Sequence, residues 1–291
     1  MAPAMRHSES RFLDLRGLRY HVRHWRGDPA RRMFLLHGWM DVSASFQFLV
    51  DALAADWDVY APDWRGYGLT AWSGADCYWF PDYMADLDAL LEALQPGAPA
   101  NLVGHSLGAN VAGLYAGVRP ERVAKFVNLE GFGMPATRPD QAPRRYARWM
   151  DELKEKPGWR PYASFAALAD RLQKSNPRLP RERAEFLAQH WGKEEGGAVV
   201  LRSDPAHKLV NATLYRLDEA QACWARVAAP VLWIDAATSE TVARMRLTPA
   251  DLAERRAAFR DLRYEVVADA GHMLHHDQPE AVARLIEQFL T

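Results

Sequence analysis

Residues 98–117 limit the fold more than any other part of the sequence. A short apolar run, residues 100–103, leads into Gly104-His105-Ser106-Leu107-Gly108, and small and apolar residues at helical spacing follow. A G-x-S-x-G between a strand and a helix is a sharp turn that pushes the serine hydroxyl out above a sheet. The Leu107 N–H, in the first turn of the helix, lacks an intrahelical partner and can donate to an oxyanion. We therefore expect Ser106 to be a nucleophile.

A serine hydroxyl at neutral pH is a poor nucleophile and needs a base at the same end of the sheet. His272 fits this role, because it follows the last predicted strand after Gly271, where a tight turn is easy. We predict that His272 takes the proton of Ser106. The neighbouring His275 and His276 are expected to be structural or to face solvent.

Strands and helices alternate along both ends of the chain. An antiparallel hairpin is expected over residues 11–25, and helices are expected over residues 46–53, 81–94, 249–259 and 279–290. The remaining predicted strands, most of them unbroken apolar runs, are 33–36, 59–63, 100–103, 123–129, 231–234 and 264–267. This pattern predicts an α/β fold with a mostly parallel, eight-stranded sheet and helices on both faces.

The alternation breaks between residues 134 and 223. Helical runs with proline-rich joints are expected there at 146–153, 164–174, 181–191 and 209–224, with one short strand at 198–201. We interpret residues 134–223 as a helical cap inserted into a core formed by residues 1–133 and 224–291.

Composition narrows the class of protein. The formal net charge of −1 over 291 residues favours neither nucleic acid nor an anionic membrane as a partner. The two cysteines are expected to be free thiols in a reducing cytoplasm. The stretch Met1–His7 has no apolar segment of a secretory signal, and no run of the chain is long enough to span a membrane. We expect a cytoplasmic protein, with a homodimer left open.

The chain resembles the α/β-hydrolase superfamily over about residues 11–290. Its matching segments are Leu36-His37-Gly38-Trp39, residues 61–68, Gly104-His105-Ser106-Leu107-Gly108 and Ala270-Gly271-His272. Within that superfamily it is similar to the serine-hydrolase-like group, through residues 36–41, 172–176 and 200–204. The resemblance implies a second oxyanion donor, the Trp39 N–H, beside that of Leu107, and no cofactor or metal.

Three carboxylates are candidates for the acid that orients His272. The family usually places it two to four residues after the 231–234 strand, where this chain has Asp235-Ala236-Ala237-Thr238-Ser239-Glu240. Some superfamily members instead place it after the strand that follows the nucleophile, which is Glu130 here. A carboxylate that ends an apolar strand needs a reason, because burying it unpaired is costly. We choose Glu130, with Asp235 and Glu240 as alternatives.

These residues predict a cofactor-free serine hydrolase acting on an ester or related acyl bond of an apolar small molecule. Tryptophans of the oxyanion loop and cap are candidates for the pocket lining: Trp39, Trp149, Trp159, Trp191 and Trp224. No basic cluster suggests an anchor for an anionic group. A C–C hydrolase, lyase or cofactor-free dioxygenase, in which His272 acts directly on the substrate, is the alternative chemistry. A ligand-binding protein with vestigial hydrolysis is a further alternative.

Overall fold

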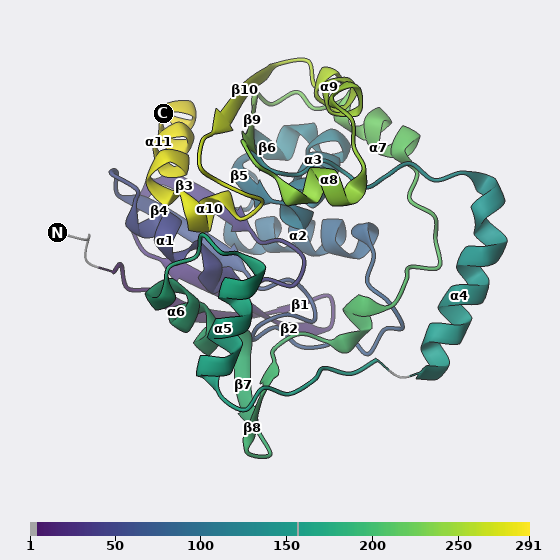
Figure 1. The fold of residues 1–291 in the computed structure, drawn as a ribbon. Helices are drawn as coiled ribbons and strands as arrows, with labels where there is room; N and C mark the ends of the chain where they lie inside the picture. The colour runs from purple at the N-terminus through teal and green to yellow at the C-terminus, as the bar shows by residue number, and fades with distance from the viewer. Residues whose placement is uncertain (1–4, 156) are drawn as a thin grey trace.

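In the computed structural model, which describes residues 5–155 and 157–291, eight strands form a single sheet (Figure 1). In chain order they are β1 (Glu9–Leu15), β2 (Leu18–Trp25), β3 (Asp28–Leu36), β4 (Trp57–Pro62), β5 (Ala100–His105), β6 (Val123–Leu129), β9 (Val231–Ala236) and β10 (Leu262–Val267). Their order across the sheet is β1-β2-β4-β3-β5-β6-β9-β10, and only the β1–β2 and β2–β4 pairs are antiparallel. The predicted sheet is confirmed. Residues 1–4 of the stretch judged to lack a secretory signal lie outside the described residues.

Helices cover both faces of the sheet. One face carries α2 (Phe80–Leu94), α3 (Leu107–Val118), α7 (Leu217–Trp224) and α9 (Pro249–Ala257). The other carries α1 (Gln47–Asp51), α10 (Leu274–Asp277) and α11 (Pro279–Leu290). On β3, Phe34 and Leu36 pack toward the first face, whereas Met33 and Leu35 pack toward the second. Burial on both faces explains why the central strands are unbroken apolar runs.

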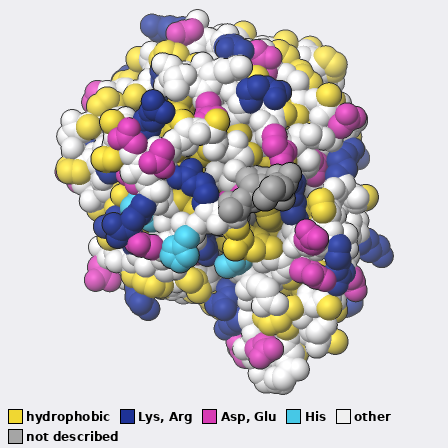
Figure 2. Space-filling model, turned by 90° about the vertical axis from the view of Figure 1, so that its left-hand side faces the viewer, with side chains coloured by type: hydrophobic (Ala, Val, Ile, Leu, Met, Phe, Trp, Pro, Cys, Tyr) yellow, Lys and Arg dark blue, Asp and Glu magenta, His cyan; other side chains and the backbone are white. Residues whose placement is uncertain are grey.

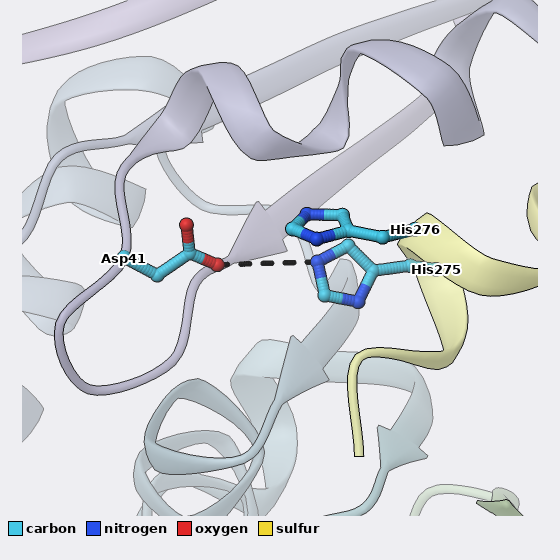
Figure 3. A group of neighbouring side chains, drawn as sticks. All are labelled: Asp41, His275 and His276. Carbon is cyan, nitrogen blue, oxygen red and sulfur yellow. Dashed lines mark ion pairs between the residues drawn. The ribbon is translucent and has the colours of Figure 1, made fainter. Parts of the chain in front are cut away.

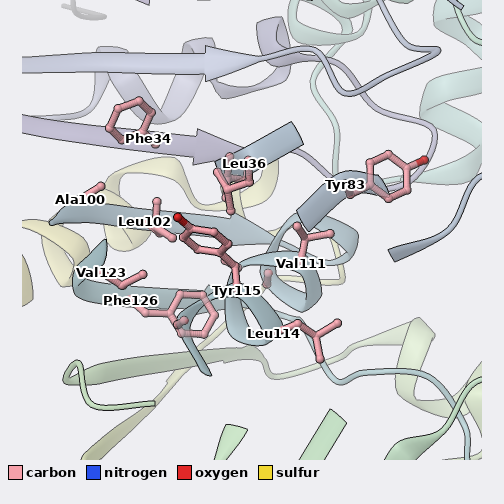
Figure 4. Packing of buried hydrophobic residues seen from close by; sticks show 14 of the residues in the cluster. Phe34, Leu36, Tyr83, Ala100, Leu102, Val111, Leu114, Tyr115, Val123 and Phe126 are labelled. Carbon is pink, nitrogen blue, oxygen red and sulfur yellow. The ribbon is translucent and has the colours of Figure 1, made fainter. Parts of the chain in front are cut away.

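The packing between the sheet and α2 and α3 appears in Figure 4. Phe34 of β3, Leu102 of β5 and Phe126 of β6 share one buried cluster with Val111 and Tyr115 of α3. A helix of small residues can approach the strands this closely, and a close-packed interior holds its first turn in place. The first residue of α3 directly follows Ser106.

Between β6 and β9 the chain leaves the sheet. It forms α4 (Ala142–Glu155), α5 (Phe165–Ser175), α6 (Arg181–Trp191) and the hairpin of β7 (Gly192–Glu195) and β8 (Ala198–Leu201), and then enters α7. Figure 1 shows α4 at the edge of the molecule, away from α5 and α6. Residues of α5, α6 and β8 share a hydrophobic cluster of their own. The helices expected at 146–153, 164–174 and 181–191 are confirmed as α4, α5 and α6.

The helix expected over residues 209–224 is wrong in its first half, because α7 begins only at Leu217. Asn211 competes with helix formation there: its side-chain oxygen accepts the Thr213 N–H at 2.8 Å, and its amide nitrogen donates to the Tyr78 carbonyl at 3.3 Å. In contrast, α8 (Glu240–Met245) was not predicted, since residues 235–240 read as a loop.

The charges on the surface agree with the sequence analysis. On the face drawn in Figure 2, acidic and basic side chains are interspersed, in keeping with the net charge of −1. Among the described residues, no helix combines the length and the apolar character needed to cross a membrane.

Candidate active site

Ser106 lies at the bend between β5 and α3, with φ 50° and ψ −112°. This backbone conformation is strained for a residue with a side chain. The flanking glycines are required by close packing: a Cβ on Gly104 would lie 2.5 Å from the Ala109 Cα, and one on Gly108 would lie 2.0 Å from the Leu36 carbonyl oxygen. The predicted turn is therefore present, and its neighbours fix it tightly.

The structure brings the predicted nucleophile, base and acid into one hydrogen-bonded chain. His272 Nε2 lies 3.0 Å from Ser106 Oγ, and His272 Nδ1 lies 3.1 Å from Glu130 Oε2. Ser106, Glu130 and His272 come from the loops after β5, β6 and β10. Carboxyl ends of parallel strands meet at one edge of a sheet, which is why residues 166 positions apart are in contact.

The Glu130 carboxylate is fully buried and receives several hydrogen bonds. Oε1 accepts the Ala236 N–H at 2.7 Å, and Oε2 accepts the Ser239 hydroxyl as well as facing His272. Burial raises the pKa of Glu130 to about 7, while the Ser239 and Ala236 hydrogen bonds act in the opposite direction. These bonds hold the carboxylate in one orientation toward the imidazole.

The two alternative acids have other partners. Asp235 is the next-to-last residue of β9, and its oxygens receive the Trp233 indole N–H at 2.6 Å and the Arg256 guanidinium at 3.3 Å. Glu240 pairs with Arg178 at 3.0 Å and accepts the backbone N–H of His272 at 3.3 Å. Neither carboxylate has a recorded bond to the His272 ring within the described residues.

The surroundings of His272 favour its neutral imidazole form. Burial lowers its pKa to about 4, the Arg244 charge adds to this shift, and Glu240 opposes it. At pH 7 the ring can donate one N–H to Glu130 and keep the Nε2 lone pair toward Ser106. That protonation state is the one a general base requires.

The loop after β3 lies against the nucleophile. A Cβ on Gly38 would lie 3.3 Å from the Ser106 Cβ. Within the described parts of the chain, the backbone N–H groups of Trp39 and Leu107 donate no recorded hydrogen bond. Met40, Ser106 and Glu130 all have positive φ, of 60°, 50° and 57°. Strained backbone conformations are common at functional sites, and three of them occur here near the Ser106 hydroxyl.

His105, the residue before Ser106, is buried and lies against His272. Its Nε2 lies 2.8 Å from the His272 carbonyl oxygen, and its ring centroid is 4.9 Å from that of His272. His275 and His276 are buried as well, so of the two expectations for them the structural one holds and the solvent-facing one is wrong.

A cavity of about 400 Å³ opens at Ser106. Trp39 lines it, as expected, but none of the other four candidate tryptophans is among its described lining residues. Those tryptophans pack elsewhere: the Trp224 ring, for example, lies 5.7 Å from the Phe259 ring in the core. The lining residues that sequence reasoning missed include Tyr78, Trp79, Phe80, Tyr83, Phe132, Met134, Asn211, Arg244 and Met245.

Most of the Phe, Tyr and Trp side chains that line this cavity come from the start of α2 and the two residues before it, and none of the described ones is a tryptophan of residues 134–223. A proline at the second position of α2 is a signal for the start of that helix, and Tyr83 is one of its buried residues. The basic residue Arg244 lies on the unpredicted α8, where Ser239 followed by Glu240 was the available signal for a helix start.

Comparisons with known proteins agree with this fold. The model of the alpha/beta hydrolase family matches residues 33–285. A serine hydrolase-like protein of Danio rerio is 30% identical over 279 residues, which are 91% of this chain and 83% of the relative. Esterase YbfF of Escherichia coli (strain K12) is 26% identical over 263 residues, 88% of this chain and 92% of the relative.

Among solved structures, the thioesterase domain from the curacin biosynthetic pathway has a TM-score of 0.86 at 24% identity, covering 97% of this chain and 99% of that chain. At that identity the likeness concerns the fold. The family match and the relatives go further: the chain belongs to the alpha/beta hydrolase family and is similar to the serine hydrolase-like proteins.

Proposed function

We propose that the protein hydrolyses an ester or related acyl bond of an apolar small molecule through a covalent acyl-enzyme on Ser106. The observation that carries the proposal is the chain of contacts from Ser106 Oγ to His272 Nε2 at 3.0 Å and from His272 Nδ1 to Glu130 at 3.1 Å. A nucleophile, a base and an orienting carboxylate in this sequence are what serine acyl transfer requires.

In the first step, Ser106 Oγ attacks the substrate carbonyl carbon while His272 Nε2 takes the hydroxyl proton. Glu130 accepts the Nδ1–H bond, which fixes the tautomer and stabilises the imidazolium. The oxygen that becomes negative accepts the N–H groups of Trp39 and Leu107, each worth about 3 kcal/mol of transition-state stabilisation. The carbon–oxygen bond to the leaving group breaks, and His272 returns the proton to that oxygen.

In the second step, water replaces the leaving group. His272 takes a proton from the water as its oxygen attacks the acyl carbon, and the bond to Ser106 Oγ then breaks as His272 protonates that oxygen. The free acid leaves and the serine is restored.

The cavity supports an apolar acyl or aromatic group. Its volume of about 400 Å³ and its aromatic wall suit a small hydrophobic ligand. Met134, His207 and Asn211 lie among its lining residues, so the segment after β6 contributes directly to the wall. We propose that residues 134–223 act as a cap over the site.

Reaction with a fluorophosphonate and turnover of p-nitrophenyl esters of increasing chain length test the proposal together. We expect an adduct on Ser106 in the folded wild type, and we expect Ser106→Ala to lose both the adduct and ester turnover. Absence of the adduct in folded wild-type protein would rule out an activated serine. Retention of much activity on the true substrate by Ser106→Ala would instead favour the chemistry in which His272 acts directly on the substrate.

A further inference from the structure

Three metal-ligating side chains meet beneath the candidate active site. Figure 3 shows the carboxylate of Asp41, on the loop after β3, and the rings of His275 and His276, on α10, turned toward one another. One ligand atom from each lies within 4.8 Å of the other two, and His275 Nε2 is 3.9 Å from Asp41 Oδ2. Neither Asp41 nor the two histidines line the cavity at Ser106.

The polar atoms of this cluster are buried without partners. Asp41, His275 and His276 are 2%, 0% and 2% exposed. In the described residues, Asp41 Oδ2, both ring nitrogens of His275 and Nε2 of His276 have no hydrogen-bond partner. The other oxygen of Asp41 is satisfied by the Val42 N–H at 2.8 Å and by the Ser45 hydroxyl. Unpaired buried polar atoms are costly, and one such atom from each of the three side chains lies close enough to the others to share a ligand.

The side chains of the cluster indicate which kind of ion would bind. Two imidazoles and one carboxylate suit a divalent transition metal such as Zn²⁺, whereas Mg²⁺ and Ca²⁺ prefer oxygen donors. Metal–ligand bonds of about 2.0–2.2 Å place tetrahedral ligand atoms about 3.4 Å apart, so the 3.9 Å pair would close by about 0.5 Å.

We propose that Asp41, His275 and His276 bind one divalent transition-metal ion at a buried site, where a water molecule completes the four ligands. The ion would tie together two loops of the site, since Asp41 follows Trp39 by two residues and His275 follows His272 by three. The His275 ring centroid lies 4.4 Å from that of His105, whose Nε2 meets the His272 carbonyl oxygen at 2.8 Å. The occupied site would stabilise the positions of the oxyanion loop and the base without touching the substrate.

The test is metal binding by the whole chain, measured without an activity assay. Chelator-treated protein is titrated with Zn²⁺, and the bound metal per chain, the midpoint of thermal unfolding and, with Co²⁺ as probe, the visible d–d absorption are recorded. We expect one ion per chain and a rise of about 5 °C in the midpoint at a hundredfold excess over the Kd, with no response to Mg²⁺.

Asp41→Asn and His276→Gln test the ligands, and His7→Gln, on an exposed residue, is the matched control for surface binding. Asparagine keeps an acceptor for Val42 and Ser45, so the first variant should fold. Both ligand variants should lose the midpoint shift and the cobalt spectrum, whereas the control should keep them. A wild type that binds no stoichiometric Zn²⁺ would overturn the proposal and point to buried water at this place. Equal zinc responses in wild type and in folded Asp41→Asn would also overturn it.

Discussion

The substitution Glu130→Gln removes the charge of the proposed triad acid and keeps its shape. The side chain of Glu130→Gln can still accept the Ala236 N–H through its amide oxygen, at the place where Oε1 now accepts it at 2.7 Å. Its amide nitrogen then faces His272 Nδ1, where Oε2 lies 3.1 Å away. That nitrogen donates, so the imidazole proton is moved to Nε2, the atom that faces Ser106.

An imidazole with its proton on Nε2 cannot accept the proton of Ser106, and the imidazolium loses its counter-charge. For a serine triad this error of tautomer costs about 10⁴ in kcat, which corresponds to about 5 kcal/mol of transition-state stabilisation. We therefore expect kcat for a p-nitrophenyl ester to fall by about 10³ to 10⁴. The thermal midpoint should change little, because the Ala236 N–H keeps its acceptor and the Ser239 hydroxyl can turn to accept from the new amide.

The assay is steady-state hydrolysis combined with thermal unfolding of each variant. Asp235→Asn and Glu240→Gln serve as matched controls, since their carboxylates are held by Arg256 and Arg178. Both should stay within about tenfold of the wild type, because neither touches the reacting atoms. The reasoning would be refuted by a folded Glu130→Gln protein within tenfold of wild-type kcat, or by Asp235→Asn losing as much.

Three further changes test the surroundings of the site. Arg244→Gln removes a cation that lowers the pKa of His272, so the acid limb of kcat/KM against pH should move up by about 0.3 pH; a downward move would contradict this sign. Gly108→Ala drives a Cβ to 2.0 Å from the Leu36 carbonyl oxygen and should cost about 2–4 kcal/mol in urea unfolding; an unchanged midpoint would show free space there. Trp79→Ala should raise KM about tenfold for long acyl chains and less for acetate; an equal rise for all chain lengths would remove Trp79 from the acyl wall.

The core of the fold could be predicted because its signals are local. The run 123–129 matches β6 residue for residue, and 279–290 matches α11. A strand buried on both faces leaves an apolar run, and a helix buried on one face leaves a period of 3.6 residues. The contact between Ser106 and His272 followed from a general rule about parallel strand ends rather than from any property of the residues between them.

The pocket wall could not be predicted in this way. Tyr78 and Trp79 precede α2, and whether such a segment turns toward Ser106 depends on packing that has no sequence period. The sequence could not decide among the carboxylates at 130, 235 and 240 for the same reason. Each lies at or after the end of a strand, at one edge of the sheet. Only the partners of the side chains, such as Arg256 beside Asp235, show which carboxylate meets His272.

The covalent intermediate gives the most direct test of the account. Wild-type protein mixed with a p-nitrophenyl ester and quenched in acid within one turnover should gain the mass of one acyl group, and peptide mapping should locate it on Ser106. Turnover without any acylated protein, or an acyl group on another residue, would contradict the claim that Ser106, His272 and Glu130 act together in acyl transfer.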